Sequence, residues 1–129
     1  MKKRRVVVTG MGMVSPLGLD VKSSWEALLQ GKSGVGYITH FDAKDYPVRI
    51  AAEVKGFDPA NYIEPKEIKK MDRFIHFAIA ATEMAIQDSG LKINSQNSER
   101  IGIIIGSGMG GLRLSNTITK HCLRKAGKE

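Results

Sequence analysis

The sequence predicts an α/β fold, because two short strand-like runs enclose two helical patterns. Arg5-Val-Val-Val-Thr9 and Ile101-Gly-Ile-Ile-Ile105 are nearly continuous β-branched runs, closed by Gly10 and Gly106. Runs without alternation are typical of strands covered on both faces, as in a parallel sheet flanked by helices. The order strand, helix, long loop, helix, strand therefore indicates the α/β class.

The first helix is expected between Asp20 and Gly31. Asp20 is a suitable N-cap, apolar residues from Val21 to Leu29 recur at helical spacing, and Gly31 suits the position after the last turn. Residues 31–65 are expected to form a loop, with one short strand around Val48–Val54.

A second helix is expected from near Pro65 to Ser89-Gly90. Its section from Phe74 to Ile86 is apolar almost all round. A helix without a polar face is buried on all sides. A chain of 129 residues offers little material to surround such a helix, so we expect part of its covering to be missing.

Composition excludes several classes of protein. The chain is 42% hydrophobic and 26% charged, which excludes wholesale disorder, and its length suits one domain. No apolar run approaches the ~18 residues of a transmembrane helix, so we expect no membrane span. The single cysteine, Cys122, excludes a disulfide framework and fits a reducing compartment. A net charge of +7 is compatible with nucleic acid or with an acidic partner.

The glycine motif Gly106-Ser-Gly-Met-Gly-Gly111 matches the G-x-G-x-x-G pattern of dinucleotide-binding proteins. Such a site also needs a second strand downstream, and no strand pattern follows. We therefore expect no nicotinamide or flavin cofactor. We interpret the glycines as a turn that lets backbone approach a ligand or another strand.

Metal and thiol chemistry are not expected either. His40, His76 and His121 share no metal-ligand spacing. Cys122 follows His121, but side chains adjacent in sequence usually point apart, so the pair is not interpreted as a nucleophile with its base.

Lys66, Lys69 and Lys70 recur at i, i+3 and i+4, which places them on one face of the expected second helix. This pattern is typical of a solvated face. It also suits a docking patch that attracts an acidic partner through long-range charge.

Ordered blocks of the sequence carry a more specific signal than any single motif. They include Arg4–Gly18, Ser24–Leu29, Gly31–Gly34, Lys69–Phe74, Met84–Leu91 and Ile105–Gly111. In this order and spacing the blocks closely resemble the N-terminal part of β-ketoacyl-acyl carrier protein synthases, type II in particular.

The resemblance implies a partial thiolase-like fold, a layered α/β half with a mixed sheet. It implies a homodimeric, cytoplasmic enzyme of fatty-acid elongation without a cofactor, although a polyketide-type condensing enzyme is an alternative within the family. The reaction is a decarboxylative Claisen condensation of an acyl thioester with malonyl-acyl carrier protein. A cysteine takes the acyl chain, and two histidines assist decarboxylation.

The resemblance also assigns roles to individual residues. Lys66, Lys69 and Lys70 fall where the family presents basic residues to acyl carrier protein, and Gly108 and Met109 fall on the turn that lines the acyl pocket. The motifs of the catalytic cysteine and both histidines match no position of this sequence, and Cys122 lacks their small neighbours. A non-catalytic carrier-protein binder or subunit partner is therefore the alternative function.

Residues 1–113 follow the family pattern, whereas residues 114–129 do not. Suitable codons for this tail, read one nucleotide earlier, give Ala-Ile-Glu-Tyr-Asn-His-Lys-Ala-Leu-Leu-Glu-Lys-Gly, which is family-like. We therefore expect a frameshifted tail. Residues 113–129 hold five basic residues against one acidic residue, which is over half of the net charge, so the nucleic-acid interpretation loses most of its support. For the chain alone we expect poor solubility or a molten state, and no condensing activity.

Overall fold

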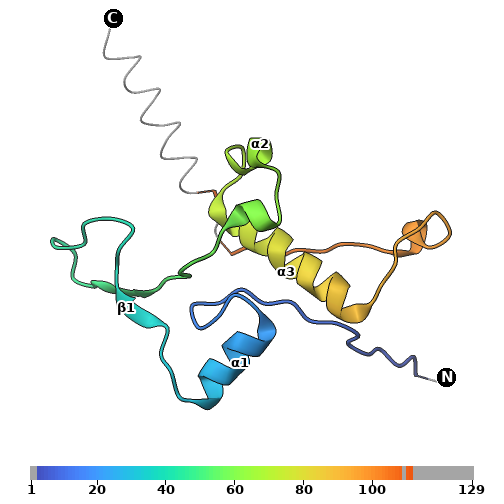
Figure 1. The fold of residues 1–129 in the computed structure, drawn as a ribbon, viewed down its shortest axis with the longest axis horizontal. Helices are drawn as coiled ribbons and strands as arrows, with labels where there is room; N and C mark the ends of the chain where they lie inside the picture. The colour runs from blue at the N-terminus through green and yellow to red at the C-terminus, as the bar shows by residue number, and fades with distance from the viewer. Residues whose placement is uncertain (1–2, 109, 112–129) are drawn as a thin grey trace, which may run out of the picture. The chain divides into compact units, whose positions relative to one another are not determined.

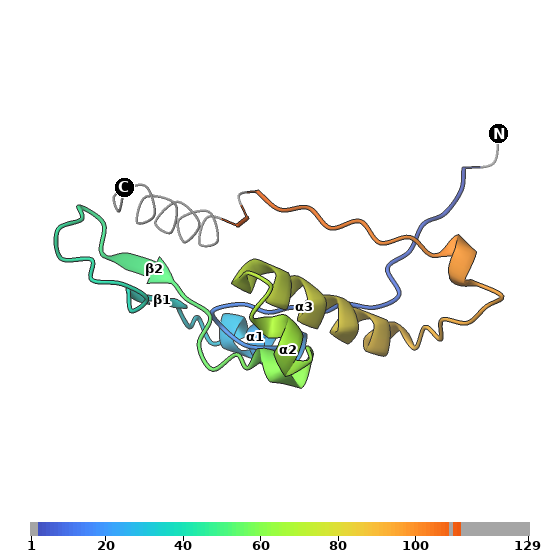
Figure 2. The same cartoon turned by 90° about the horizontal axis from the view of Figure 1, so that it is seen from above.

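The computed structural model describes residues 3–108 and 110–111. The chain divides into two units. The first comprises the residues up to Asp58 together with Ala80–Lys92, and the second comprises Pro59–Ile79 together with the residues from Ile93 onward. Figures 1 and 2 show the elements, which are α1 (Val21–Leu29), β1 (Val35–Tyr37), β2 (Ile50–Ala52), α2 (Pro65–Ile68), α3 (Arg73–Ser89) and 3-10 turns at Pro59–Asn61 and Ser98–Arg100.

Helix α1 confirms the prediction for this segment. The Ser23 backbone N–H donates to Asp20 Oδ1 at 2.7 Å, so Asp20 is the N-cap. The bonds from Ser23 hold the pKa of the Asp20 carboxyl below its ordinary value of 3.8. Gly31 adopts φ +66°, a left-handed conformation that suits the residue after a helix.

Strands β1 and β2 form an antiparallel pair in which Val35 faces Ala52 and Tyr37 faces Ile50. The prediction of a strand around residues 48–54 is confirmed by β2. Strand β1 was not predicted, because three residues interrupted by Gly36 carry too little periodicity to be recognised.

The strands predicted at residues 5–9 and 101–105 are wrong for this chain. Within the described residues the sheet consists of β1 and β2. Val6 is 93% exposed and Ile104 is 100% exposed. A strand is held by backbone hydrogen bonds to a neighbouring strand, and neither run is paired with one in the described part of the chain.

The single helix predicted from Pro65 to Ser89-Gly90 is two helices, α2 and α3. Asp72 begins the second, because its side-chain Oδ1 accepts from Arg73 N at 2.7 Å and its carbonyl accepts from Ile75 N at 3.0 Å. Asp side chains compete with helix hydrogen bonds and favour helix starts. Lys66 therefore lies in α2, whereas Lys69 and Lys70 follow it.

The glycines of the first unit pack an extended segment against α3. A Cβ on Gly10 would meet Ala85 O and lie 2.6 Å from Ser89 N, and one on Gly12 would meet Ala81 O. The Met11 N–H between them donates to Asp88 Oδ2 at 2.8 Å. These glycines permit a close backbone approach, which is the kind of role that we infer from the sequence for glycine-rich turns.

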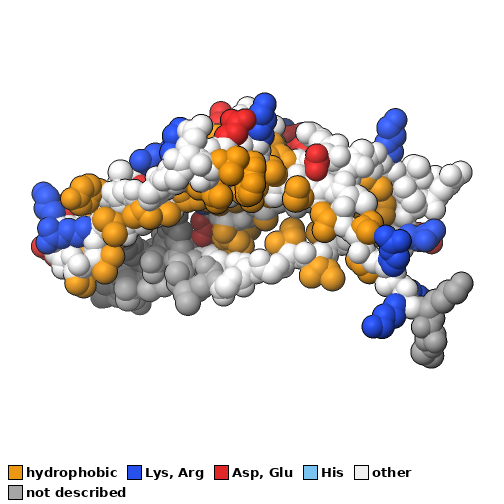
Figure 3. Space-filling view, turned by 90° about the horizontal axis from the view of Figure 1, so that it is seen from below, with side chains coloured by type: hydrophobic (Ala, Val, Ile, Leu, Met, Phe, Trp, Pro, Cys, Tyr) orange, Lys and Arg blue, Asp and Glu red, His pale blue; other side chains and the backbone are white. Residues whose placement is uncertain are grey.

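Helix α3 is partly covered by the described residues. Ala80 is fully buried, but Phe74 is 39% exposed. Figure 3 shows hydrophobic side chains at the surface of the molecule. Among the described residues, no helix is both long and apolar enough to cross a membrane.

Candidate functional site

The predicted docking lysines lie on a short segment of the second unit that we call the lysine turn, Lys66–Lys70. All three lysines are exposed. Pro65 opens α2 at a position where a missing N–H costs nothing. Lys69 retains helical backbone angles (φ −70°, ψ −17°), so the expected shared face extends from Lys66 as far as Lys69.

The charge of the lysine turn is partly compensated within the turn. Lys70 Nζ lies 2.6 Å from Glu67 Oε1, and the Lys70 side chain is 66% exposed. An exposed pair of this kind contributes about 1 kcal/mol or less. For Lys66 and Lys69, no ion pair is found within the described part of the chain. These two cations are therefore the ones best placed to meet an acidic partner.

A buried histidine holds the lysine turn against α3. The His76 ring Nε2 lies 3.1 Å from the Ile68 carbonyl oxygen, and His76 is 8% exposed. A carbonyl only accepts, so His76 Nε2 carries the proton and donates. Ile68 is the last residue of α2, and its carbonyl also accepts from Met71 N at 3.4 Å, so the His76 ring adds a second bond at the end of this helix.

His76 thus has a structural role at the junction of α2 and α3. Among the described residues no group of three or more His, Cys, Asp or Glu side chains could hold a metal ion. His121 and Cys122 lie outside the described residues.

The glycine turn, Gly106–Gly111, contacts the first turn of α3. A Cβ on Gly110 would lie 2.5 Å from Phe74 Cζ, so the Gly110 backbone rests against the end of the Phe74 ring. Gly111 adopts φ +79°, a conformation that favours glycine. Gly108 is exposed, and a Cβ there would meet nothing within 4 Å. Met109 lies outside the described residues.

The structure therefore brings the lysine turn and Gly110, a neighbour of the predicted Gly108, to the start of α3. The lysine turn is fastened there through His76, and the glycine turn lies there against Phe74. Neither His76 nor Phe74 was recognised as a supporting residue from the sequence. Their position was the one available signal, because Phe74 ends the family-like block Lys69–Phe74 and His76 follows it.

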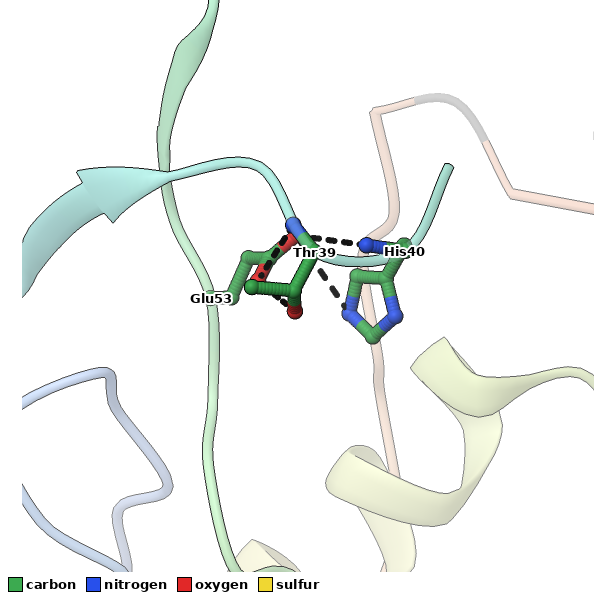
Figure 4. A network of polar contacts seen from close by, with 3 residues as sticks. All are labelled: Thr39, His40 and Glu53. Carbon is green, nitrogen blue, oxygen red and sulfur yellow. Dashed lines mark hydrogen bonds and ion pairs between the residues drawn. The ribbon is translucent and has the colours of Figure 1, made fainter. Parts of the chain in front are cut away.

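A polar cluster in the first unit was also missed. Glu53 follows β2, and its carboxylate accepts from Thr39 Oγ1 at 2.7 Å, from Thr39 N at 3.0 Å and from His40 N at 3.3 Å (Figure 4). The His40 ring Nε2 lies 3.8 Å from Glu53 Oε1. The hydrogen bonds from Thr39 hold the pKa of the Glu53 carboxyl below its ordinary value of 4.5. The cluster joins the segments that follow β1 and β2.

An open apolar cavity of about 800 Å³ adjoins α1 in the same unit. Trp25, which lines it, is 59% exposed. Apolar side chains provide most of its wall: Met11, Met13, Leu17, Val21, Trp25 and Leu28. No sequence motif had singled it out.

Comparison with known proteins identifies relatives for nearly the whole chain. Residues 3–127 match the family model of the β-ketoacyl synthase N-terminal domain. The 3-oxoacyl-[acyl-carrier-protein] synthase 2 of Vibrio cholerae is 56% identical over 117 residues, which are 91% of this chain and 28% of the relative. The protein of the same name from Staphylococcus aureus is 43% identical over 124 residues, which are 96% of this chain and 30% of the relative.

Solved structures give the same result for the fold. A β-ketoacyl synthase from Burkholderia phymatum superposes with a TM-score of 0.69 at 31% identity, over 92% of this chain and 30% of the other. The ishigamide ketosynthase/chain length factor gives a TM-score of 0.63 at 38% identity, over 69% of this chain and 22% of the other. The predicted partial thiolase-like α/β fold is confirmed, and the chain spans less than a third of the length of these relatives.

Proposed function

The chain belongs to the β-ketoacyl synthase family, and we propose that it forms the carrier-docking part of a type II β-ketoacyl-acyl carrier protein synthase. The observation that carries this proposal is the lysine turn, which exposes three cations and is fastened to α3 by His76. The substrates are acyl and malonyl thioesters of acyl carrier protein, in fatty-acid elongation. We also propose that the full-length enzyme is a cytoplasmic homodimer.

The proposed reaction joins two thioesters. A cysteine thiolate attacks the acyl-carrier thioester and the carrier leaves as its thiol, so the cysteine holds the acyl chain as a thioester. Loss of CO₂ from the malonyl thioester then leaves an enolate. The enolate carbon attacks the acyl carbonyl, a carbon–carbon bond forms, and the bond from that carbonyl to the cysteine sulfur breaks. Hydrogen-bond donors that stabilise the oxyanion of the tetrahedral intermediate supply much of the rate enhancement in such reactions.

The residues of this chain would act in binding rather than in bond making. Lys66 and Lys69 would attract the acidic carrier protein and orient it during encounter, since such charges raise association rates. Gly108 and Met109 would lie on the turn beside the acyl chain, where a flexible thioether admits chains of different shape. The reaction requires no cofactor.

Charge reversal of the lysine turn tests the proposal. The substrate is acyl carrier protein, and the protein is a complete synthase in which residues 3–111 replace the matching segment of the Vibrio cholerae relative. Combined Lys66→Glu, Lys69→Glu and Lys70→Glu should lower the carrier affinity by about tenfold or more at low salt. The difference should shrink as ionic strength rises, because the Debye length falls to ~8 Å at 0.15 M.

A matched control carries the same change of charge elsewhere. Lys32, Lys44 and Lys55 lie in the first unit, outside the lysine turn. Their replacement by Glu should alter the carrier affinity much less. Equal losses in the two triple variants would refute a local docking site and leave only an effect of net charge.

The second candidate function is a non-catalytic carrier-protein binder. A pulldown of the 129-residue chain with acyl carrier protein separates the two. Binding by the chain alone, abolished by the three lysine reversals, would favour the second candidate. Binding only by the complete synthase would favour the first.

The proposed division of the chain places family sequence at residues 1–113 and a frameshifted tail at 114–129. The family match extends through residue 127 and thus includes most of this tail. Residues 112–129 lie outside the described part of the structure, and the coding DNA is the material that tests the division.

A further inference from the structure

The first turn of α3 holds an aromatic ring against the glycine turn. A Cβ on Gly110 would lie 2.5 Å from Phe74 Cζ and 2.8 Å from each Cε atom of the same ring. An ordinary contact of a Cβ begins at 3.4 Å. Only a glycine at position 110 therefore allows the backbone to lie this close to the ring.

Gly110 differs in this respect from the other glycines of its segment. A Cβ on Gly102, Gly106 or Gly108 would meet nothing within 4 Å. The ring of Phe74 therefore provides a reason for the glycine at position 110.

The backbone at Phe74 is held in place by hydrogen bonds on both sides. It is the second residue of α3, between Asp72, which begins the helix, and His76, which is bonded to α2. A phenylalanine side chain has only two torsions, so a fixed backbone leaves the ring few positions. Phe74 is 39% exposed, and the glycine turn covers the end of its ring.

We propose that Phe74 is a positioning residue that sets the place of the glycine turn, and through it the lengths of acyl chain that the enzyme accepts. The proposal rests on the proposed function, which gives the turn its acyl ligand. Leu at position 74 would remove the atoms that the turn rests on. Ala at position 110 would force ring and turn apart by about 1 Å, the difference between 2.5 and 3.4 Å.

The first test concerns the contact itself and uses the complete synthase carrying residues 3–111, because loose packing is expected for the 129-residue chain alone. Protons near an aromatic ring carry a ring-current shift, so the Gly110 Hα resonances report the ring of Phe74. Phe74→Leu and Gly110→Ala should both abolish the shift at residue 110. Phe77→Leu is the matched control, because the Phe77 ring lies under the Arg73 guanidinium, 5.3 Å from it, and not at Gly110. Unchanged Gly110 resonances in Phe74→Leu would overturn the proposal.

The second test concerns selectivity and uses the complete synthase carrying residues 3–111. The ratio of kcat/KM for long and short acyl substrates should change about tenfold or more in Phe74→Leu and Gly110→Ala, as for the loss of a pocket contact. Phe77→Leu and Gly102→Ala should keep the ratio. The carrier affinity should stay constant throughout, because the lysine turn is untouched.

The outcomes separate this proposal from the function on which it rests. An active synthase whose ratio is the same in all four variants would overturn the role of Phe74 and leave the proposed function standing. A synthase with Phe74 intact that condenses no substrate would overturn the proposed function, and with it the acyl ligand of the turn.

Discussion

Apolar side chains that are already exposed in the folded chain predict a weak response to urea. Val6 is 93% exposed, Leu29 is 68% exposed and Ile104 is 100% exposed. Unfolding exposes little new surface at such residues, and the urea m-value is proportional to the surface that unfolding exposes. A compact protein of 14.1 kDa exposes about 13,700 Å² on unfolding. We expect an m-value clearly below that of a compact protein of 129 residues measured alongside.

The assay is a urea titration followed by far-UV circular dichroism and by fluorescence of Trp25, the single tryptophan. Trp25 is already 59% exposed, so its emission should move little while the helical signal is lost. A hydrophobic dye should bind before any urea is added, as it does to states with loose packing. A full-sized m-value with coincident, steep transitions of a monomer would refute the reasoning from exposed surface.

Gly12→Ala should weaken the packing of the Gly10–Gly12 segment on α3 by about 1–3 kcal/mol, because the new methyl group would meet Ala81 O. Amide exchange of Met11 should then be about five- to 150-fold faster. Thr39→Val should raise the pKa of Glu53 toward 4.5, because Thr39 supplies the largest lowering contribution, and an NMR titration measures it. In the unsubstituted chain this carboxylate stabilises the structure above about pH 4.5 and loses that effect as pH falls through its lower folded pKa. Sequencing the gene through codon 113 should reveal codons for residues 114–126 that encode the family-like peptide one nucleotide earlier.

Each of these predictions has a control or a contrary result. Gly36→Ala adds a methyl group whose nearest neighbour is Lys55 Nζ at 4.0 Å, so Met11 exchange should not change. Thr9→Val alters an exposed threonine outside the Glu53 cluster and should leave that pKa in place. Codons that give no family-like peptide in the displaced frame would contradict the frameshift.

Elements with local causes were predictable from the sequence. Helix α1 depends on Asp20 at its start and Gly31 at its end, and both signals act within one or two turns of the backbone. The break between α2 and α3 was missed because side chains compete there with the helix for hydrogen bonds to the backbone. Apolar periodicity runs on through the break, but the Asp72 side chain and the His76 ring satisfy the backbone groups there.

The two β-branched runs, in contrast, could not be assigned from local signals alone. Residues 6–8 and 103–105 have strong strand propensity, yet β-propensity is largely a measure of packing against neighbouring strands. Without such neighbours in the described part, Val6 and Ile104 stay exposed. The same reasoning applies to the open cavity beside α1. The sequence shows that the helix has an apolar face that another segment should cover, but it does not show which segment covers it.

The family-like block Lys69–Phe74 acquires a physical explanation from these contacts. Helix α3 begins after Asp72, whose side chain accepts from Arg73 N. Lys69 and Lys70 therefore precede α3 and lie on an exposed turn. The ring that follows, Phe74, faces Gly110, and the buried His76 returns to the end of α2. A continuous helix through this block would keep the lysines in register with α3. In the structure the Ile68 carbonyl instead accepts from Met71 N at 3.4 Å and lies 3.1 Å from His76 Nε2. The break between α2 and α3, which the apolar periodicity of the sequence hides, therefore lets the lysine turn and Gly110 of the glycine turn both contact the start of α3.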